Sequence, residues 1–177
     1  PRGAEGPPDH PKNLEYMRAR LQQLKEFNVV LAATSGPQEF LDLWSQELPD
    51  RLILGPIFPC NDGLNPNRNR YRCFTDGGEF PNFAWLEAQY TKGTYQLMGE
   101  LLNQYAGIAY DDPRMDKYYE LAERLEIPVT IHTHAAPPRT ASNCCPNFRV
   151  SLGHPLLLEE VLVRYPKLEV QIMHANP

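Results

Sequence analysis

Two histidines end one apolar run of the sequence, and related residues hold the same place in the runs before and after it. His132 and His134 follow residues 129–131, and they share one face because side chains alternate along a strand. Glu100 ends the preceding run and His174 ends the following one. Imidazole and carboxylate groups are ligands for Zn²⁺ and similar divalent ions. The pattern predicts a metal site of Glu100, His132 and His174, with His134 further out toward a substrate; the alternative is a set of independent polar core groups.

These runs belong to an alternation of strand-like and helix-like segments that extends along the whole sequence. Strands are expected at residues 29–34, 52–57, 95–100, 128–132 and 168–174, and helices at 13–27, 40–48, 83–90, 113–125 and 155–164. Continuous apolar strands that alternate with helices are typical of a parallel α/β fold. No glycine-rich phosphate-binding motif follows a strand, so an open nucleotide-binding sheet is disfavoured. Polar residues at the carboxyl ends of three strands favour an incomplete TIM (β/α)8 barrel, whose active site lies at those ends.

Several helices carry a start signal. Asn13 is expected to cap the first helix, and Pro113 suits the first turn of its helix because proline lacks an N–H group. His154 precedes Pro155 at the start of a predicted helix, so a capping role is favoured for it over catalysis.

The chain is expected to form a single, partial barrel domain over residues 1–177, with a Pro/Gly-rich lead at 1–12. Two polar segments, 59–82 and 135–153, are too long for passive connectors and are expected on the catalytic side. Their arginines suggest an anionic substrate group, since guanidinium binds carboxylate in a bidentate manner; a solvated surface is the alternative. These arginines are Arg68, Arg70, Arg72, Arg139 and Arg149, of which Arg139 and Arg149 are the candidate substrate contacts.

Composition excludes two classes of partner. The 177 residues carry 17 Lys and Arg against 22 Asp and Glu, a net charge of -5, which does not suit neutralisation of nucleic-acid phosphates. No apolar run approaches the roughly 20 residues of a membrane span. The four cysteines form no CxxC pair, and free thiols are expected rather than disulfides. A small-molecule substrate is the expected partner, while a homo-oligomer and the compartment are left open.

The order of short motifs in the second half of the chain resembles the metal-dependent amidohydrolases of the TIM-barrel type. The resemblance is closest to the amidohydrolase-related branch, which also contains lactone hydrolases and aromatic-acid decarboxylases. The motifs are Gly99-Glu100-Leu101, residues 103–108, Asp112-Pro113, Leu121-Ala122-Glu123, Ile127-Pro128-Val129, His132, residues 155–162, residues 165–168 and Met173-His174-Ala175.

That resemblance implies positions for the candidate ligands. His132 would end the fifth barrel strand and His174 the sixth, so that the chain would cover the second to sixth strands. Glu100 would match a carboxylate ligand of the TatD-like nucleases on the fourth strand. His134 stands where the family usually has a small residue. The HxH pair of the first strand and the Asp of the eighth are expected outside this sequence, whose ends both look cut.

The resemblance also implies a function: a metal-dependent hydrolase of an ester, lactone or amide bond, in which His132 and His174 serve catalysis and bound zinc activates water. Such an ion lowers the pKa of water from 15.7 toward about 7. The alternatives are a metal-dependent decarboxylase of an aromatic or unsaturated carboxylic acid, and a non-catalytic binding protein. Five strands would leave open edges, so the 177 residues alone are expected to be unstable and inactive.

Overall fold

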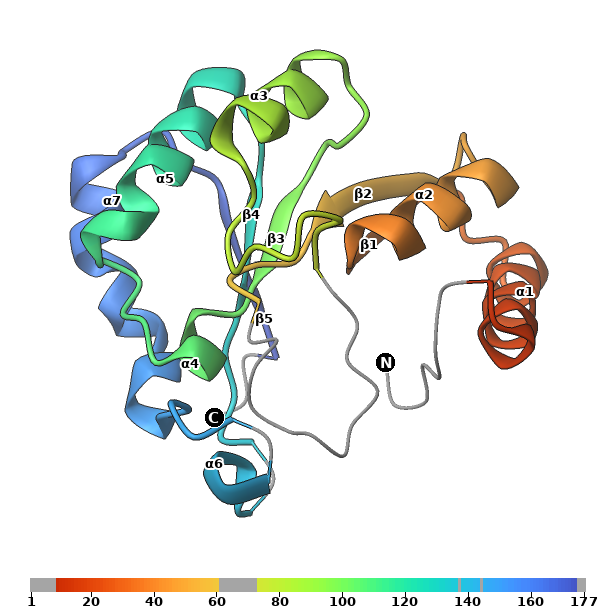
Figure 1. The fold of residues 1–177 in the computed structure, drawn as a ribbon. Coiled ribbons are helices and arrows are strands. Elements are labelled where there is room, and N and C mark those ends of the chain that lie inside the picture. The colour runs from red at the N-terminus through yellow and green to blue at the C-terminus, as the bar shows by residue number, and fades with distance from the viewer. Residues whose placement is uncertain (1–8, 61–72, 137, 144, 175–177) are drawn as a thin grey trace.

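The computed structural model describes residues 9–60, 73–136, 138–143 and 145–174 (Figure 1). Helices and strands alternate along most of this part of the chain. In order, the elements are α1 (Pro11–Glu26), β1 (Ala32–Gly36), α2 (Gln38–Glu47), β2 (Leu52–Pro56), α3 (Phe83–Thr91), β3 (Met98–Leu101), α4 (Asn103–Ala106), α5 (Pro113–Leu125), β4 (Val129–His132), α6 (Thr140–Asn143), the 3₁₀ turns η1 (Val150–Gly153) and η2 (Pro155–Leu158), α7 (Glu159–Arg164) and β5 (Val170–Met173).

The strands pair in parallel and in the order of the sequence. β1 pairs with β2, and β3, β4 and β5 form a second sheet in that order. A parallel bridge between Phe58 and Leu101 links the two sheets, and the Leu54 carbonyl accepts hydrogen bonds from the N–H groups of Gln96 and Leu97. The prediction of an α/β fold with parallel strands is confirmed. Closure into a barrel stays a prediction.

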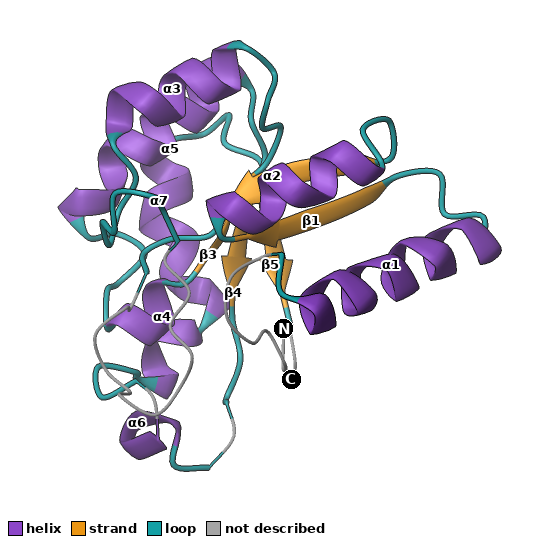
Figure 2. Ribbon diagram, turned by 45° about the vertical axis from the view of Figure 1, so that its right-hand side comes forward, coloured by secondary structure: helices purple, strands orange, loops and turns teal. Residues whose placement is uncertain are grey.

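One core extends from the second sheet and the helices beside it to β2 and α2 of the first sheet. Figures 1 and 2 show α3, α5 and α7 on one side of β3, β4 and β5, while α1 and α2 accompany β1 and β2. The inward face of α5 includes the fully buried Tyr118. Its ring centroid lies 4.8 Å from that of Phe58, just beyond β2, and 5.9 Å from that of Phe80. The buried rings of Phe58 and Tyr118, with the partly buried Phe80, join the two sheets through one shared core.

Helix starts follow the sequence signals, with one correction. Asp112 caps α5 by accepting from Arg114 N–H at 3.0 Å, with Pro113 in the first turn. The capping role expected for His154 is confirmed, because its Nδ1 accepts from Leu156 N–H at 3.3 Å. The cap expected at Asn13 is wrong. His10 holds that position, three residues before Asn13, and the helix begins at Pro11 because proline is favoured in the first turn.

The expectation of free thiols is also wrong. Cys60 and Cys73 form a disulfide, and the described part of the chain contains no free cysteine. Backbone hydrogen bonds fix both partners, since Cys60 N–H donates to Glu79 O and Cys73 O accepts from Gln38 N–H. Their Cα atoms are thereby 5.8 Å apart although 13 residues separate them in sequence. Such a pairing depends on tertiary contacts and leaves no spacing motif.

Candidate metal site

Three neighbouring strands bring the predicted ligands together. Glu100 lies in β3, His132 ends β4, and His174 follows β5. Because His132 pairs with Met173 across the sheet, His174 comes one residue beyond that level. The imidazole centroids of His132 and His174 are 4.8 Å apart. One ligand atom from each of the three residues lies within 4.8 Å of the others, so the group can surround one ion.

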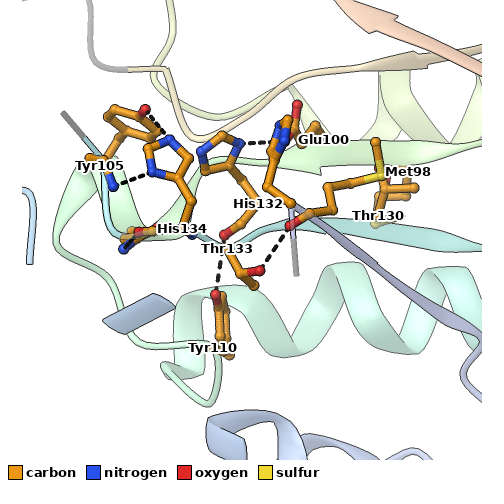
Figure 3. A network of polar contacts seen from close by, with 12 residues as sticks. Met98, Glu100, Tyr105, Tyr110, Thr130, His132, Thr133 and His134 are labelled. Carbon is orange, nitrogen blue, oxygen red and sulfur yellow. Dashed lines mark hydrogen bonds and ion pairs between the residues drawn. The ribbon is translucent and has the colours of Figure 1, made fainter. Parts of the chain in front are cut away.

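Glu100 connects the two imidazoles of this group. Its Oε1 forms a hydrogen bond with Nδ1 of His132, drawn in Figure 3, and lies 3.4 Å from Nε2 of His174. The side chains of Glu100 and His132 are 19% and 9% exposed, whereas that of His174 is 53% exposed. Burial opposes ionisation of Glu100, but the hydrogen bond from His132 and the nearby imidazoles outweigh it, so its pKa lies below the ordinary value. Glu100 is therefore an anion beside two imidazoles.

His132 has one ring nitrogen that makes no hydrogen bond. Its Nε2 is buried and lacks a partner in the structure, although buried polar atoms are normally satisfied. The backbone of His132 is held firmly, because Tyr110 donates from its hydroxyl to the His132 carbonyl at 3.2 Å. A fixed, buried imidazole with an unused nitrogen suits a residue that binds a ligand.

Gly99 allows Glu100 to reach this position. It has φ +105°, and a Cβ added there would lie 2.5 Å from both Thr130 O and Leu101 N. Only glycine adopts that backbone conformation and leaves room for β4. The glycine thus brings the end of β3 close enough to β4 for Glu100 to contact His132.

His134 lies beside the three-residue group. Its ring centroid is 4.4 Å from that of His132, closer than expected, because β4 ends at His132 and the strand alternation stops there. Its Nε2 is 3.0 Å from the Tyr105 hydroxyl, and its Nδ1 accepts from Ala136 N–H (Figure 3). Burial, and then repulsion from His132 and His174, lowers the pKa of His134. Because Tyr105 and Ala136 contact its two ring nitrogens, the ring of His134 is held in place. Its contact with a substrate stays a prediction.

The loop arginines are not brought to the site by any described contact. Arg149 donates from its guanidinium to the carbonyls of Pro146 and Phe148, both at 2.8 Å, so it stabilises its own loop. Arg139 is exposed just before α6. Arg68, Arg70 and Arg72 lie outside the described residues. Substrate binding by Arg139 and Arg149 remains a prediction.

Sequence reasoning gave no role to Gln104, Tyr105 or Tyr110, although all three contact the site. Gln104 is fully buried and hydrogen-bonds the backbone of His134. The signal that could have found Gln104 and Tyr105 is their place directly after the strand that carries Glu100. Tyr110 has no such signal, since its contact with His132 depends on the fold.

None of the described helices combines the length and apolar character that a membrane crossing needs.

Comparison with known proteins gives one structural relative. No family model matches the chain, and no curated protein matches it. A crystal structure of a putative amidohydrolase from Staphylococcus aureus matches with a TM-score of 0.51 and 15% sequence identity. The match covers 90% of this chain and 59% of that chain. The chain therefore shares its α/β fold with part of that solved structure.

Proposed function

We propose that this chain carries part of the active site of a metal-dependent hydrolase, with Glu100, His132 and His174 as ligands of a divalent ion. The observation that carries the proposal is their convergence within 4.8 Å from three adjacent strands. Two imidazoles and one carboxylate match the donor set of zinc sites. The buried Nε2 of His132 also supports the proposal, because it has no hydrogen-bond partner and its lone pair is available to a metal ion.

The strand order supports a barrel. Among the described strands, β1 pairs with β2, and β3 with β4 and β4 with β5, all in parallel. The Phe58–Leu101 bridge and the hydrogen bonds to Leu54 O place β2 beside β3. A doubly wound sheet reverses its strand order at a switch point, where ligands bind, and no such reversal occurs among these strands. In a barrel, the carboxyl ends of the strands form the active-site face, and the three candidate ligands lie at that end of β3, β4 and β5.

Each residue has a role in this proposal. A bound divalent ion supplies Lewis-acid activation of water and of a carbonyl group. Glu100 contributes negative charge and orients His132 through Nδ1. The side chain of His174 is half exposed, so it lies on the open side of the group, from which a substrate would approach. The substrate is a small ester, lactone or amide, and a carboxylate on it would suit Arg139 or Arg149.

Metal binding tests the site directly. Calorimetric titration of the full natural protein with Zn²⁺ should show a strong site. His132→Ala should weaken its affinity by more than the about 10- to 100-fold cost of losing a residue that only hydrogen-bonds a ligand. The matched control is His154→Ala, which removes a histidine that only caps η2. Equal zinc affinity in the wild type and His132→Ala would overturn the site.

The reaction is tested in the full natural protein, because the chain spans 59% of its structural neighbour. With zinc bound, incubation of ester, lactone and amide substrates in ¹⁸O-labelled water should give products that contain one labelled oxygen. Loss of CO₂ from an aromatic or unsaturated acid without such labelling would instead identify a decarboxylase. Metal binding without turnover of any of these substrates would favour a binding protein.

A further inference from the structure

Gln104 holds the segment that follows β4 through both groups of its side-chain amide. Its Nε2 donates to the His134 carbonyl at 2.7 Å, and its Oε1 accepts from the His134 N–H at 3.2 Å. The side chain therefore pairs with one residue of backbone as a neighbouring strand would. Gln104 is fully buried, so water does not replace these hydrogen bonds.

The next residue of α4 holds the side chain of the same histidine. The Tyr105 hydroxyl lies 3.0 Å from Nε2 of His134, while Nδ1 accepts from Ala136 N–H. Because Nδ1 is an acceptor, the neutral ring carries its hydrogen on Nε2. His134 is thus fixed at its backbone by Gln104 and at its ring by Tyr105 and Ala136.

Two glycines allow α4 to lie this close to the surrounding loops. A Cβ at Gly153 would come 2.4 Å from Nε2 of Gln104. A Cβ at Gly107, which has φ +72°, would come 2.6 Å from Asn147 O. The packing leaves the Gln104 amide little freedom to move, and it remains aligned with His134.

We propose that Gln104 is a positioning residue: it holds His134 in its Nε2–H form beside the metal-ligand group, so that His134 and Tyr105 form a fixed wall for the substrate. The rings of His134 and Tyr105 lie 5.9 Å apart, and each lies close to that of His132. The substrate-facing part of this proposal rests on the proposed function. The conformational part does not, since it concerns His134 alone.

NMR of the histidine ring nitrogens measures this positioning without a substrate. In the full natural protein, ¹H–¹⁵N spectra should show a protonated Nε2 and an acceptor Nδ1 for His134. Gln104→Ala should shift both signals toward a tautomer average, because the backbone that places Ala136 is released. The signals of His10, which caps α1, should stay unchanged.

Gln96→Ala is the matched control. Gln96 also bridges backbone groups, donating to Gly93 O and accepting from Leu54 N–H, but at the opposite end of β3. This variant should leave the His134 spectrum unchanged. A second variant, Gly153→Ala, crowds the Gln104 amide without removing it and should shift the His134 signals in the same direction as Gln104→Ala. Unchanged His134 signals in Gln104→Ala, or in Gly153→Ala if the former does not fold, would overturn the proposal.

Kinetics separate this proposal from the proposed function. In the full protein, Gln104→Ala should raise KM about tenfold, the factor that corresponds to about 1.4 kcal/mol of lost binding free energy, with little change in kcat. Its zinc affinity should stay within about twofold of wild type, because the ligands Glu100, His132 and His174 are untouched. A spectral shift in a protein without hydrolase activity would uphold the positioning of His134 and reject the hydrolase. If the protein is an active hydrolase but Gln104→Ala changes neither its KM nor the His134 signals, the hydrolase is upheld and the positioning role of Gln104 is rejected.

Discussion

The two sheets of this chain differ in what their strands carry at the carboxyl end. β1 ends in Ser35-Gly36 and β2 in Gly55-Pro56, which are small residues or proline. The second sheet has Glu100, His132 and His174 at the same level. One sheet thus supplies the candidate ligands, while the other supplies residues that let backbones approach one another.

Gly55 shows what the small residues do. A Cβ added there would lie 2.3 Å from Leu97 O and 2.7 Å from Gly99 O. Because Gly55 has no Cβ, β2 can approach the segment that leads into Glu100. The first sheet therefore contributes to the site through packing against β3.

The segments that follow the strands are also fixed in different ways. Beyond β2, the disulfide between Cys60 and Cys73 joins two backbone positions. Beyond β4, Gln104 and Tyr105 hold His134 through directional hydrogen bonds. A disulfide limits the freedom of the unfolded chain, whereas hydrogen bonds to a single residue also decide where its side chain points. The difference predicts that stability and site geometry respond to different substitutions.

The largest effect on stability is expected at the junction of the two sheets. Phe58 is fully buried, and its ring contacts Phe74, Phe80 and Tyr118. Phe58→Ala should lower the free energy of unfolding by about 3–5 kcal/mol, because it leaves a cavity and removes apolar burial. Denaturant unfolding measures the change.

The control for this variant is Phe27→Ala, at a phenylalanine that is 77% exposed. It should change the unfolding free energy by no more than about 0.5 kcal/mol. Two unfolding transitions in Phe58→Ala, in place of one, would contradict the prediction. They would show that the two sheets unfold separately and do not share a cooperative core.

The disulfide should matter for stability and leave the metal site intact. Replacing both Cys60 and Cys73 by Ala should cost about 3 kcal/mol, the loop-closure value for a loop of this size. Zinc affinity should remain unchanged, because the disulfide joins segments beyond β2, while the candidate ligands come from β3, β4 and the residue after β5. Urea unfolding and zinc titration of the double variant measure both quantities.

The double variant is preferable to reduction, because Cys145 is also disulfide-bonded and a reductant would act there too. A large loss of zinc affinity in the double variant would show that the covalent link also sets the site geometry. The contrast between the two regions would then be wrong.

The smallest effect is expected at the start of α5, which packs against the second sheet. The hydrogen bond from Arg114 lowers the pKa of Asp112 to about 2, against some desolvation that raises it. Asp112→Ala should cost about 1 kcal/mol at pH 7 through loss of the cap. Because the folded pKa is depressed, this contribution is present above the ordinary pKa of 3.8 and should disappear as the pH falls toward 2.

Thermal unfolding of the wild type and Asp112→Ala at pH 7 and pH 2.5 measures this difference. Asp112→Asn keeps a capping side chain and should recover most of the stability at pH 7. A gap between wild type and Asp112→Ala that grows on acidification would contradict the assigned pKa shift.

Much of the α/β fold was predictable because the signals are local. The apolar periodicity that predicts a helix at 113–125 gives α5 with the same bounds, Pro113–Leu125. Other boundaries moved where local contacts intervened. The expected strand at 29–34 begins only at Ala32, because Val29 N–H still bonds Leu24 O at the end of α1. The expected helix at 155–164 divides into η2 and α7.

The sequence by itself determined which residues end the strands, since strand length and apolar character are properties of consecutive residues. It therefore indicated Glu100, His132 and His174 as a group. Only the tertiary structure decided that Cys60 meets Cys73, that His134 turns back beside His132, and that Gln104 holds it. Each of these contacts joins segments that are far apart in sequence or lie beyond a strand's end, where no periodic pattern fixes the direction of a side chain. They depend on how closely backbones approach, and Gly55, Gly99 and Gly153 set that approach.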